Sequence, residues 1–154
     1  MSPVPGTATE PTGGVIRRIV VAYDHSPQAR RALERATALA RNHGTQLITV
    51  MVVAHLPHHA ATMGEVEEEI VAEERASRSW LAAARAIADE CGVQVTVEIL
   101  AGPAARELVR AAEKVHADLI VLGRRGHRGP WAPHLRSTAR QVSRRASCPV
   151  LIVR

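Results

Sequence analysis

Two glycines and a serine in the last third of the chain have a spacing that suits anion binding. Gly123 and Gly126 follow an apolar stretch, and nine residues separate Gly126 from Arg136 and Ser137, where a helix is predicted to begin. Glycines after a strand let backbone amides approach an anion closely. The free amides of a first helical turn, together with a serine hydroxyl, can hold a phosphate. A tight turn would also need glycines, so the spacing alone leaves both interpretations open.

Asp24 is the other residue whose place in the sequence suggests chemistry. It ends an apolar run at residues 16–23 (IRRIVVAY) and is followed by Ser26 and Pro27. A carboxylate at the end of a strand can accept hydrogen bonds from ribose hydroxyls or amino groups. The alternative is that Asp24 caps the next helix, although Ser26 before a proline is itself a typical N-cap.

The segments around these residues predict alternating strands and helices. Strands are expected at residues 16–23, 47–53, 93–99, 119–122 and 149–153. Helices are expected from Ser26 to Gly44, at 65–90, after Gly102-Pro103 and at 137–146. This order predicts an α/β fold with helices on both faces of a five-stranded parallel, doubly wound sheet. Such sheets bind ligands beyond the carboxyl ends of their strands, where the strand order reverses.

Two of these elements carry more detailed expectations. Alternation of Val93, Val95, Val97 and Ile99 with polar residues predicts a half-exposed edge strand. The inner face of the helix at 65–90 is expected to carry Val66, Ile70, Leu81, Ala84, Ile87 and Ala88. The apolar last strand, 149–153, is expected to offer an edge for pairing with a second chain.

Composition limits the class of protein. The 154 residues suit one domain, at 15–154, after a disordered tail at 1–14 that is rich in Pro, Gly and Thr. Aromatic residues make up 2% and Phe is absent, so Val, Ile, Leu and Ala must build the core. No apolar run reaches the roughly 20 residues of a membrane span. Two cysteines, read as reduced thiols, predict a cytoplasmic protein.

Charge is divided along the sequence. Residues 123–154 contain eight arginines and no acidic residue. An acidic cluster precedes them, at Glu65, Glu67, Glu68, Glu69, Glu73 and Glu74. The basic part favours an anionic partner. Arg124, Arg125 and Arg128 could contact phosphate or lie in a solvated basic loop, and the solvated loop is favoured for Arg124 and Arg125. For the stripe Arg136, Arg140 and Arg144 a solvated helix face is favoured over contact with nucleic acid.

Two further groups of residues have simple interpretations. A histidine cluster at His55, His58 and His59 is interpreted as a surface loop, because no cysteine or carboxylate stands at a spacing suited to a metal. Trp131 lies in the glycine-containing segment and is interpreted as a packing anchor, with a ligand cover or a dimer contact as alternatives.

Three segments together resemble the universal stress protein family over residues 15–154: IVVAYDHSP near the start, AGPAARELVRAAEKVHADLIVLGRRG, and SCPVLIV at the end. The resemblance implies a Rossmann-like sheet in the order 3-2-1-4-5, of the adenine-nucleotide alpha-hydrolase-like type. It also implies homodimers joined through the last strand, an unidentified protein partner, and binding of ATP or AMP, with Mg²⁺ carried by the triphosphate. The implied nucleotide contacts are Ala22, Asp24, Val52, Leu122, Gly123, Gly126, Arg136, Ser137 and Thr138.

Arg136 is the departure from that pattern, because the ATP-binding members of the family have a third glycine there. An arginine either blocks the phosphate site, if bare backbone is needed, or pairs with the phosphates through its guanidinium. Two functions therefore stay open: a nucleotide-binding regulator of the stress response, or a dimeric interaction module that no longer binds nucleotide. An enzyme is not expected, because the sequence has no GxxxxGK[ST] loop and no visible pair of nucleophile and base.

Overall fold

A computed structural model describes residues 15–53, 63–124 and 138–154, in which strands and helices alternate as predicted. Their order is β1 (Arg18–Ala22), α1 (Pro27–His43), β2 (Gln46–Val53), α2 (Met63–Glu90), β3 (Val95–Ala101), α3 (Ala104–Lys114), β4 (Leu119–Gly123), α4 (Thr138–Arg145) and β5 (Val150–Val153). The predicted tail at 1–14 lies outside the described residues. β1 and β3 each begin two residues later than the apolar runs suggested.

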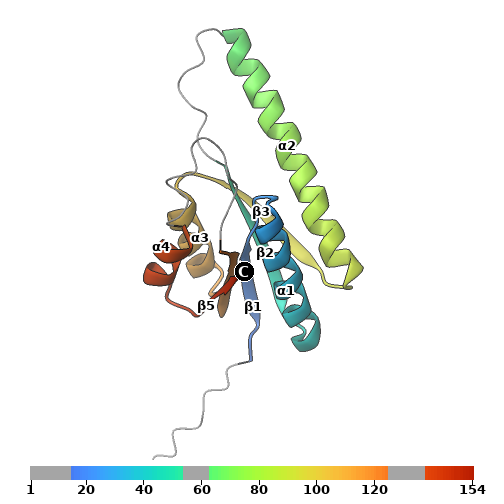
Figure 1. The fold of residues 1–154 in the computed structure, drawn as a ribbon, viewed down its shortest axis with the longest axis vertical. Helices are drawn as coiled ribbons and strands as arrows, with labels where there is room; N and C mark the ends of the chain where they lie inside the picture. Colours follow the sequence, from blue (N-terminus) through green and yellow to red (C-terminus); the bar gives the residue numbers. More distant parts are fainter. Residues whose placement is uncertain (1–14, 54–62, 125–137) are drawn as a thin grey trace, which may run out of the picture.

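All five strands pair in parallel, in the order β3-β2-β1-β4-β5 (Figure 1). The fold class and strand order are therefore confirmed. At the centre of the sheet, Val20 of β1 lies opposite Ile48 of β2 and Ile120 of β4. β2 and β3 are added on one side of β1, and β4 and β5 on its other side, so the strand order reverses between β1 and β4. The carboxyl ends of these two strands lie side by side.

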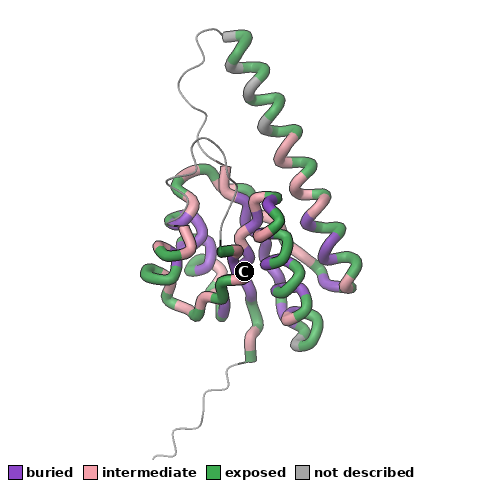
Figure 2. The backbone as a smooth tube through the Cα atoms, viewed as in Figure 1, coloured by how far each residue is buried: buried purple, intermediate pink, exposed green. Residues whose placement is uncertain are grey.

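Two apolar cores lie on opposite faces of the sheet. On one face, α1 and α2 pack through residues such as Leu33 and Ala84 against Ile19 and Met51. On the other, α3 and α4 pack through residues such as Leu108 and Val142 against Val20 and Ile120. Burial is concentrated in the strands and on the inward helix faces (Figure 2). Because β1, β2 and β4 are covered on both faces, their sequences are continuously apolar.

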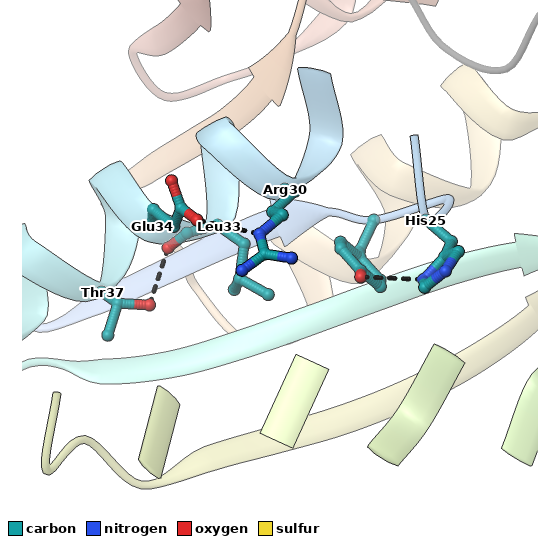
Figure 3. A network of polar contacts seen from close by, with 6 residues as sticks. His25, Arg30, Leu33, Glu34 and Thr37 are labelled. Carbon is teal, nitrogen blue, oxygen red and sulfur yellow. Dashed lines mark hydrogen bonds and ion pairs between the residues drawn. The ribbon is translucent and has the colours of Figure 1, made fainter. Parts of the chain in front are cut away.

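Helix α1 begins and ends where the sequence predicts. The Ser26 hydroxyl accepts a hydrogen bond from the Ala29 N–H at 3.1 Å, and Pro27 opens the first turn. Gly44 closes the helix in the left-handed conformation, with a φ of 63°. On the buried side the Thr37 hydroxyl donates to the Leu33 carbonyl at 2.6 Å, as Figure 3 shows.

Helix α2 is longer than the sheet beside it and extends past the body of the domain (Figure 1). Ala84, Ile87 and Ala88 are buried and Leu81 is half-buried, as predicted. The prediction for Ile70 is wrong, because its side chain is 40% exposed. The apolar periodicity correctly reports a face of the helix, but in the first half of α2 that face has little to pack against. The side chain of Val66 lies outside the described residues.

Both sheet edges are partly exposed, as expected. β3 is one edge, and the predicted alternation holds from Val95 to Val97. It breaks at the next two residues, where Glu98 is half-buried beside Lys114 of α3 and Ile99 is 46% exposed, so the side predicted for Ile99 is wrong. β5 is the other edge, and Leu151 and Ile152 are 39% and 40% exposed. Within the described part of the chain, no helix is long and apolar enough to cross a membrane. Cys91 and Cys148 are both free thiols.

Candidate functional site

A cavity of about 310 Å³ opens at the carboxyl edge of the sheet, where the strand order reverses. Its walls are mainly apolar and come from the ends of β1, β2 and β4 and from α3: Ala22, Val50, Val52, Leu122 and Leu108. A volume of this size lies at the lower end of the range of small-molecule pockets. The carboxyl ends of neighbouring parallel strands converge there, as the sequence predicted for this class of sheet.

Six of the predicted ligand contacts line this cavity. They come from β1, β2, β4 and α4 and from the turn after β1: Ala22, Asp24, Val52, Leu122, Gly123 and Thr138. The other three lie outside the described residues: Gly126, Arg136 and Ser137. So do the remaining residues singled out from the sequence, Arg125, Arg128, Trp131, His55, His58 and His59. Positions more than a hundred residues apart in the chain are thus brought to one hollow.

Asp24 has a structural role as well as a place in the cavity wall. Its Oδ1 accepts a hydrogen bond from the Ser26 N–H at 3.0 Å, which fixes the turn between β1 and α1. The residue that caps α1 is Ser26, not Asp24. Asp24 is therefore not the helix cap, but its carboxylate orders Ser26, which is. Asp24 is also the only carboxylate among the described lining residues, so a role in ligand binding stays open.

Gly123 is required by packing between elements. A Cβ atom at this position would lie 2.8 Å from the carbonyl carbon of Gln28 in the first turn of α1. Only glycine lets the end of β4 approach α1 this closely. The sequence suggested that Gly123 lets backbone amides approach an anion. Contact with the Gln28 backbone is a different reason for a glycine here, and it is sufficient by itself.

The rim of the cavity favours negative charge. The first turns of α1, α3 and α4 reach it through Ala29, Ala104 and Thr138, so the positive ends of three helix dipoles lie at the rim. Arg124 also lines the cavity, and its side chain is exposed. Its backbone N–H donates to the Val153 carbonyl at 2.7 Å, which ties the end of β4 to β5. Arg140 and Arg144 on α4 are exposed, in agreement with a solvated face.

Sequence reasoning missed an aromatic group beside the cavity, made of Tyr23, His25 and Trp80. Tyr23 and Trp80 line the cavity, and the Tyr23 hydroxyl makes a 3.1 Å hydrogen bond with Nδ1 of His25 (Figure 3). The rings of His25 and Trp80 are stacked, with centroids 6.2 Å apart and planes 5° from parallel. Burial is the main cause that raises the pKa of Tyr23 above its usual value.

A signal for Trp80 was present in the sequence. Trp80, Ala84 and Ile87 recur at helical spacing, so the indole belongs to the inward face of α2. That periodicity places Trp80 toward the core, but it does not say that the residue reaches the end of β1.

These features define an α/β protein with a candidate ligand site at the topological switch point of a parallel sheet. Residues 16–154 match the model of the Universal stress protein family, and the chain belongs to this family. Universal stress protein MJ0531 of Methanocaldococcus jannaschii is 33% identical over 141 residues, covering 90% of this chain and 82% of that protein.

Solved structures give the same assignment. Universal stress protein UspA from Lactobacillus plantarum is 27% identical, with a TM-score of 0.74 over 90% of this chain and 98% of its own. A universal stress protein solved in complex with cAMP is 26% identical, with a TM-score of 0.68 over 91% and 98% of the two chains.

Proposed function

We propose that this universal stress protein binds an adenine nucleotide, ATP or AMP, in the cavity at the carboxyl edge and acts as a regulator in the stress response. The observation that carries the proposal is the convergence of six predicted contacts from separate elements on one cavity. A relative of the same fold has been solved with cAMP, which is itself an adenine nucleotide.

The lining residues fit the parts of such a ligand. Ala22, Val52 and Leu122 provide an apolar surface for the base, and Asp24 can accept hydrogen bonds from ribose hydroxyls. Thr138, in the first turn of α4, and the neighbouring helix N-termini suit the phosphates. Gly126, Arg136 and Ser137 would complete the phosphate site. Mg²⁺ would arrive with the triphosphate.

The same residues support a binding role in preference to catalysis. Among the described lining residues there is no His, Cys, Lys or Glu, and the Asp24 carboxylate already accepts a hydrogen bond from the Ser26 N–H. The hydroxyls of Ser26 and Tyr23 have structural partners, since Ser26 caps α1 and Tyr23 is hydrogen-bonded to His25. The nucleotide would act as a ligand that shifts the affinity of the protein for a partner.

A thermal-shift titration with ATP and AMP, each with and without Mg²⁺, tests the proposal. We expect a saturable rise in Tm that is lost in Asp24→Ala and partly kept in Asp24→Asn, since the amide keeps one acceptor oxygen. Arg136→Gly separates the two interpretations of that position: stronger binding indicates an obstruction, and weaker binding indicates a phosphate contact. The absence of any shift at millimolar nucleotide would favour the interaction module without nucleotide.

We also propose that the protein forms a homodimer, and the edge strand β5 supports this. Leu151 and Ile152 are apolar, about 40% exposed, and lie on a strand with one unpaired edge. Leu151→Lys should convert a dimer into a monomer in analytical ultracentrifugation, whereas Ile99→Lys on the opposite edge should not. A monomeric wild-type protein would contradict this part. The cytoplasmic location stays a prediction.

A further inference from the structure

Trp80 is the one described residue of α2 that lines the cavity at the carboxyl edge. The side chains of α2 before it are largely exposed, and Ala84, Ile87 and Ala88 after it are buried. Trp80 therefore lies where the helix first meets the body of the domain. Its indole is partly buried and packs against the core on the α1 and α2 face of the sheet.

The cavity contains an unusual share of the aromatic residues. The sequence has two Trp, one Tyr and no Phe, and two of these three aromatic side chains, Trp80 and Tyr23, line this cavity. The cores are otherwise built from aliphatic side chains. Trp80 packs against the core and also lines the cavity, so part of its aromatic surface is available to a ligand.

The exposed ring of His25 stacks on the indole of Trp80. Its ring lies parallel to Trp80 within 5°, at a centroid distance of 6.2 Å that suits an offset stack. Its own backbone has a φ of 63°, which is uncommon for a residue other than glycine. A hydrogen bond between Nδ1 and the buried Tyr23 hydroxyl fixes the ring. The end of β1 is thereby linked through His25 to α2.

We propose that the Trp80 indole contacts the heterocyclic base of the bound nucleotide, with His25 as its positioning residue. This inference rests on the proposed function, since it names the residue that recognises the base. An indole presents a flat, polarizable face on which a purine can stack, whereas ribose and phosphate offer no such surface. Trp80 would therefore favour ligands with a heteroaromatic base over phosphorylated sugars.

Calorimetric titration with AMP tests the contact in matched variants. Trp80→Leu keeps an apolar side chain but loses the aromatic face, and we expect about tenfold weaker binding, since stacking on an aromatic side chain contributes that much or more per base. Trp80→Phe restores an aromatic ring and should stay within about threefold of wild type. Leu81→Ala, next to Trp80 but outside the cavity wall, should change affinity by less than about twofold.

Fluorescence gives a second readout that packing alone would not change. In Trp131→Phe, Trp80 is the only remaining tryptophan, and AMP should quench its emission with the same midpoint as the calorimetric titration. Adding His25→Ala should reduce the amplitude of this quenching and weaken AMP about threefold, because the indole is no longer held.

These experiments separate failure of the Trp80 inference from failure of the proposed function. If wild type and Trp80→Leu bind AMP equally, or if the emission of Trp80 does not respond to bound AMP, the inference is wrong and the proposed function survives. If Trp80→Phe loses binding as fully as Trp80→Leu, the residue has a packing role only, which also overturns the inference. If wild type does not bind AMP at millimolar concentration, the proposed function and this inference fail together.

Discussion

The two ends of the sheet each carry a hollow, and the larger one is not the candidate site. The hollow at the amino end, about 660 Å³ in volume, is lined largely by exposed polar side chains such as Arg41, Arg85, Asp89 and Gln94. The cavity at the carboxyl end is half that size, about 310 Å³, and has apolar walls. Volume alone would select the amino end.

The direction of the chain explains the difference. In an all-parallel sheet with helical crossovers, every helix begins near the carboxyl end of one strand and ends near the amino end of the next. The first turns of α1, α3 and α4 therefore surround the smaller cavity, and the last turns of α1 and α2 border the larger hollow. The positive ends of the helix dipoles favour anions at the first end, and the negative ends disfavour them at the second.

The largest expected difference between the two ends is in the free energy of unfolding, when a glycine at each end is replaced by alanine. Gly123→Ala should lower the free energy of unfolding by about 3 kcal/mol, because the new Cβ would overlap the backbone of Gln28. Gly44→Ala, with a φ of 63° and open space around it, should cost only about 1 kcal/mol of backbone strain. Urea unfolding of both variants checks this, and equal losses would show that close packing at the carboxyl end is not special.

Two aspartates test ligand binding at the two ends. Asp24→Ala should weaken AMP by about 2 kcal/mol, or roughly thirtyfold, because it removes a charged acceptor from the cavity wall. Asp89→Ala in the amino-end hollow should leave the affinity within about twofold. Calorimetric titration measures both. A larger loss in Asp89→Ala would move the site to the other end of the sheet.

Thr49, in the middle of β2, tests whether stability and binding can be separated. Its hydroxyl is fully buried and has no hydrogen-bond partner among the described residues. Thr49→Val keeps the shape of the side chain and should raise the free energy of unfolding by about 1 kcal/mol, with no change in AMP affinity. A loss of stability on urea denaturation would mean that the hydroxyl has a partner after all.

Replacing Asp118, at the amino end of the sheet, should have the smallest effect on the free energy of unfolding. Its Oδ2 accepts the N–H groups of Arg17 and Arg18 at 2.8 and 2.9 Å, and these bonds lower the pKa of the carboxyl below its ordinary 3.8. A pKa lowered in the folded state adds stability above pH 3.8, and this stability is lost as the pH falls through the lowered value.

Asp118→Ala should therefore cost about 0.5 kcal/mol near neutral pH, a small amount because the carboxylate is exposed. The difference from wild type should shrink in urea unfolding as the pH is taken well below 3.8. A difference that is the same at both pH values would show that ionisation of Asp118 does not contribute.

The sequence predicted the scaffold well because its signals are local. Ser26 and Gly44 mark the ends of α1 by capping chemistry, and apolar runs mark the buried strands. Asp24 and Gly123 were found because they directly follow strands, and the carboxyl ends of parallel strands meet at one edge. The residues that end a strand can be recognised without knowing how the helices pack.

What the sequence did not predict depends on packing between distant elements. Ile70 fits the apolar face of α2, but the helix extends past the body of the domain there, and no periodicity reveals where a partner surface ends. Trp80 reaches the cavity from α2, which packs against α1 and β3, so its position depends on how these elements meet. The steric need for Gly123 depends on Gln28, which lies on another helix.

The most direct test of the site is a titration of ¹⁵N-labelled protein with AMP, followed by ¹H–¹⁵N correlation spectra. The spectra record amide shifts at both ends of the sheet in the same experiment. We predict saturable shifts in the amides of Asp24, Gly123 and Thr138 at the carboxyl end, with Gly92 and Gln94 at the amino end unchanged. Shifts centred on Gly92 and Gln94, or no shifts at millimolar AMP, would contradict a nucleotide site at the carboxyl edge.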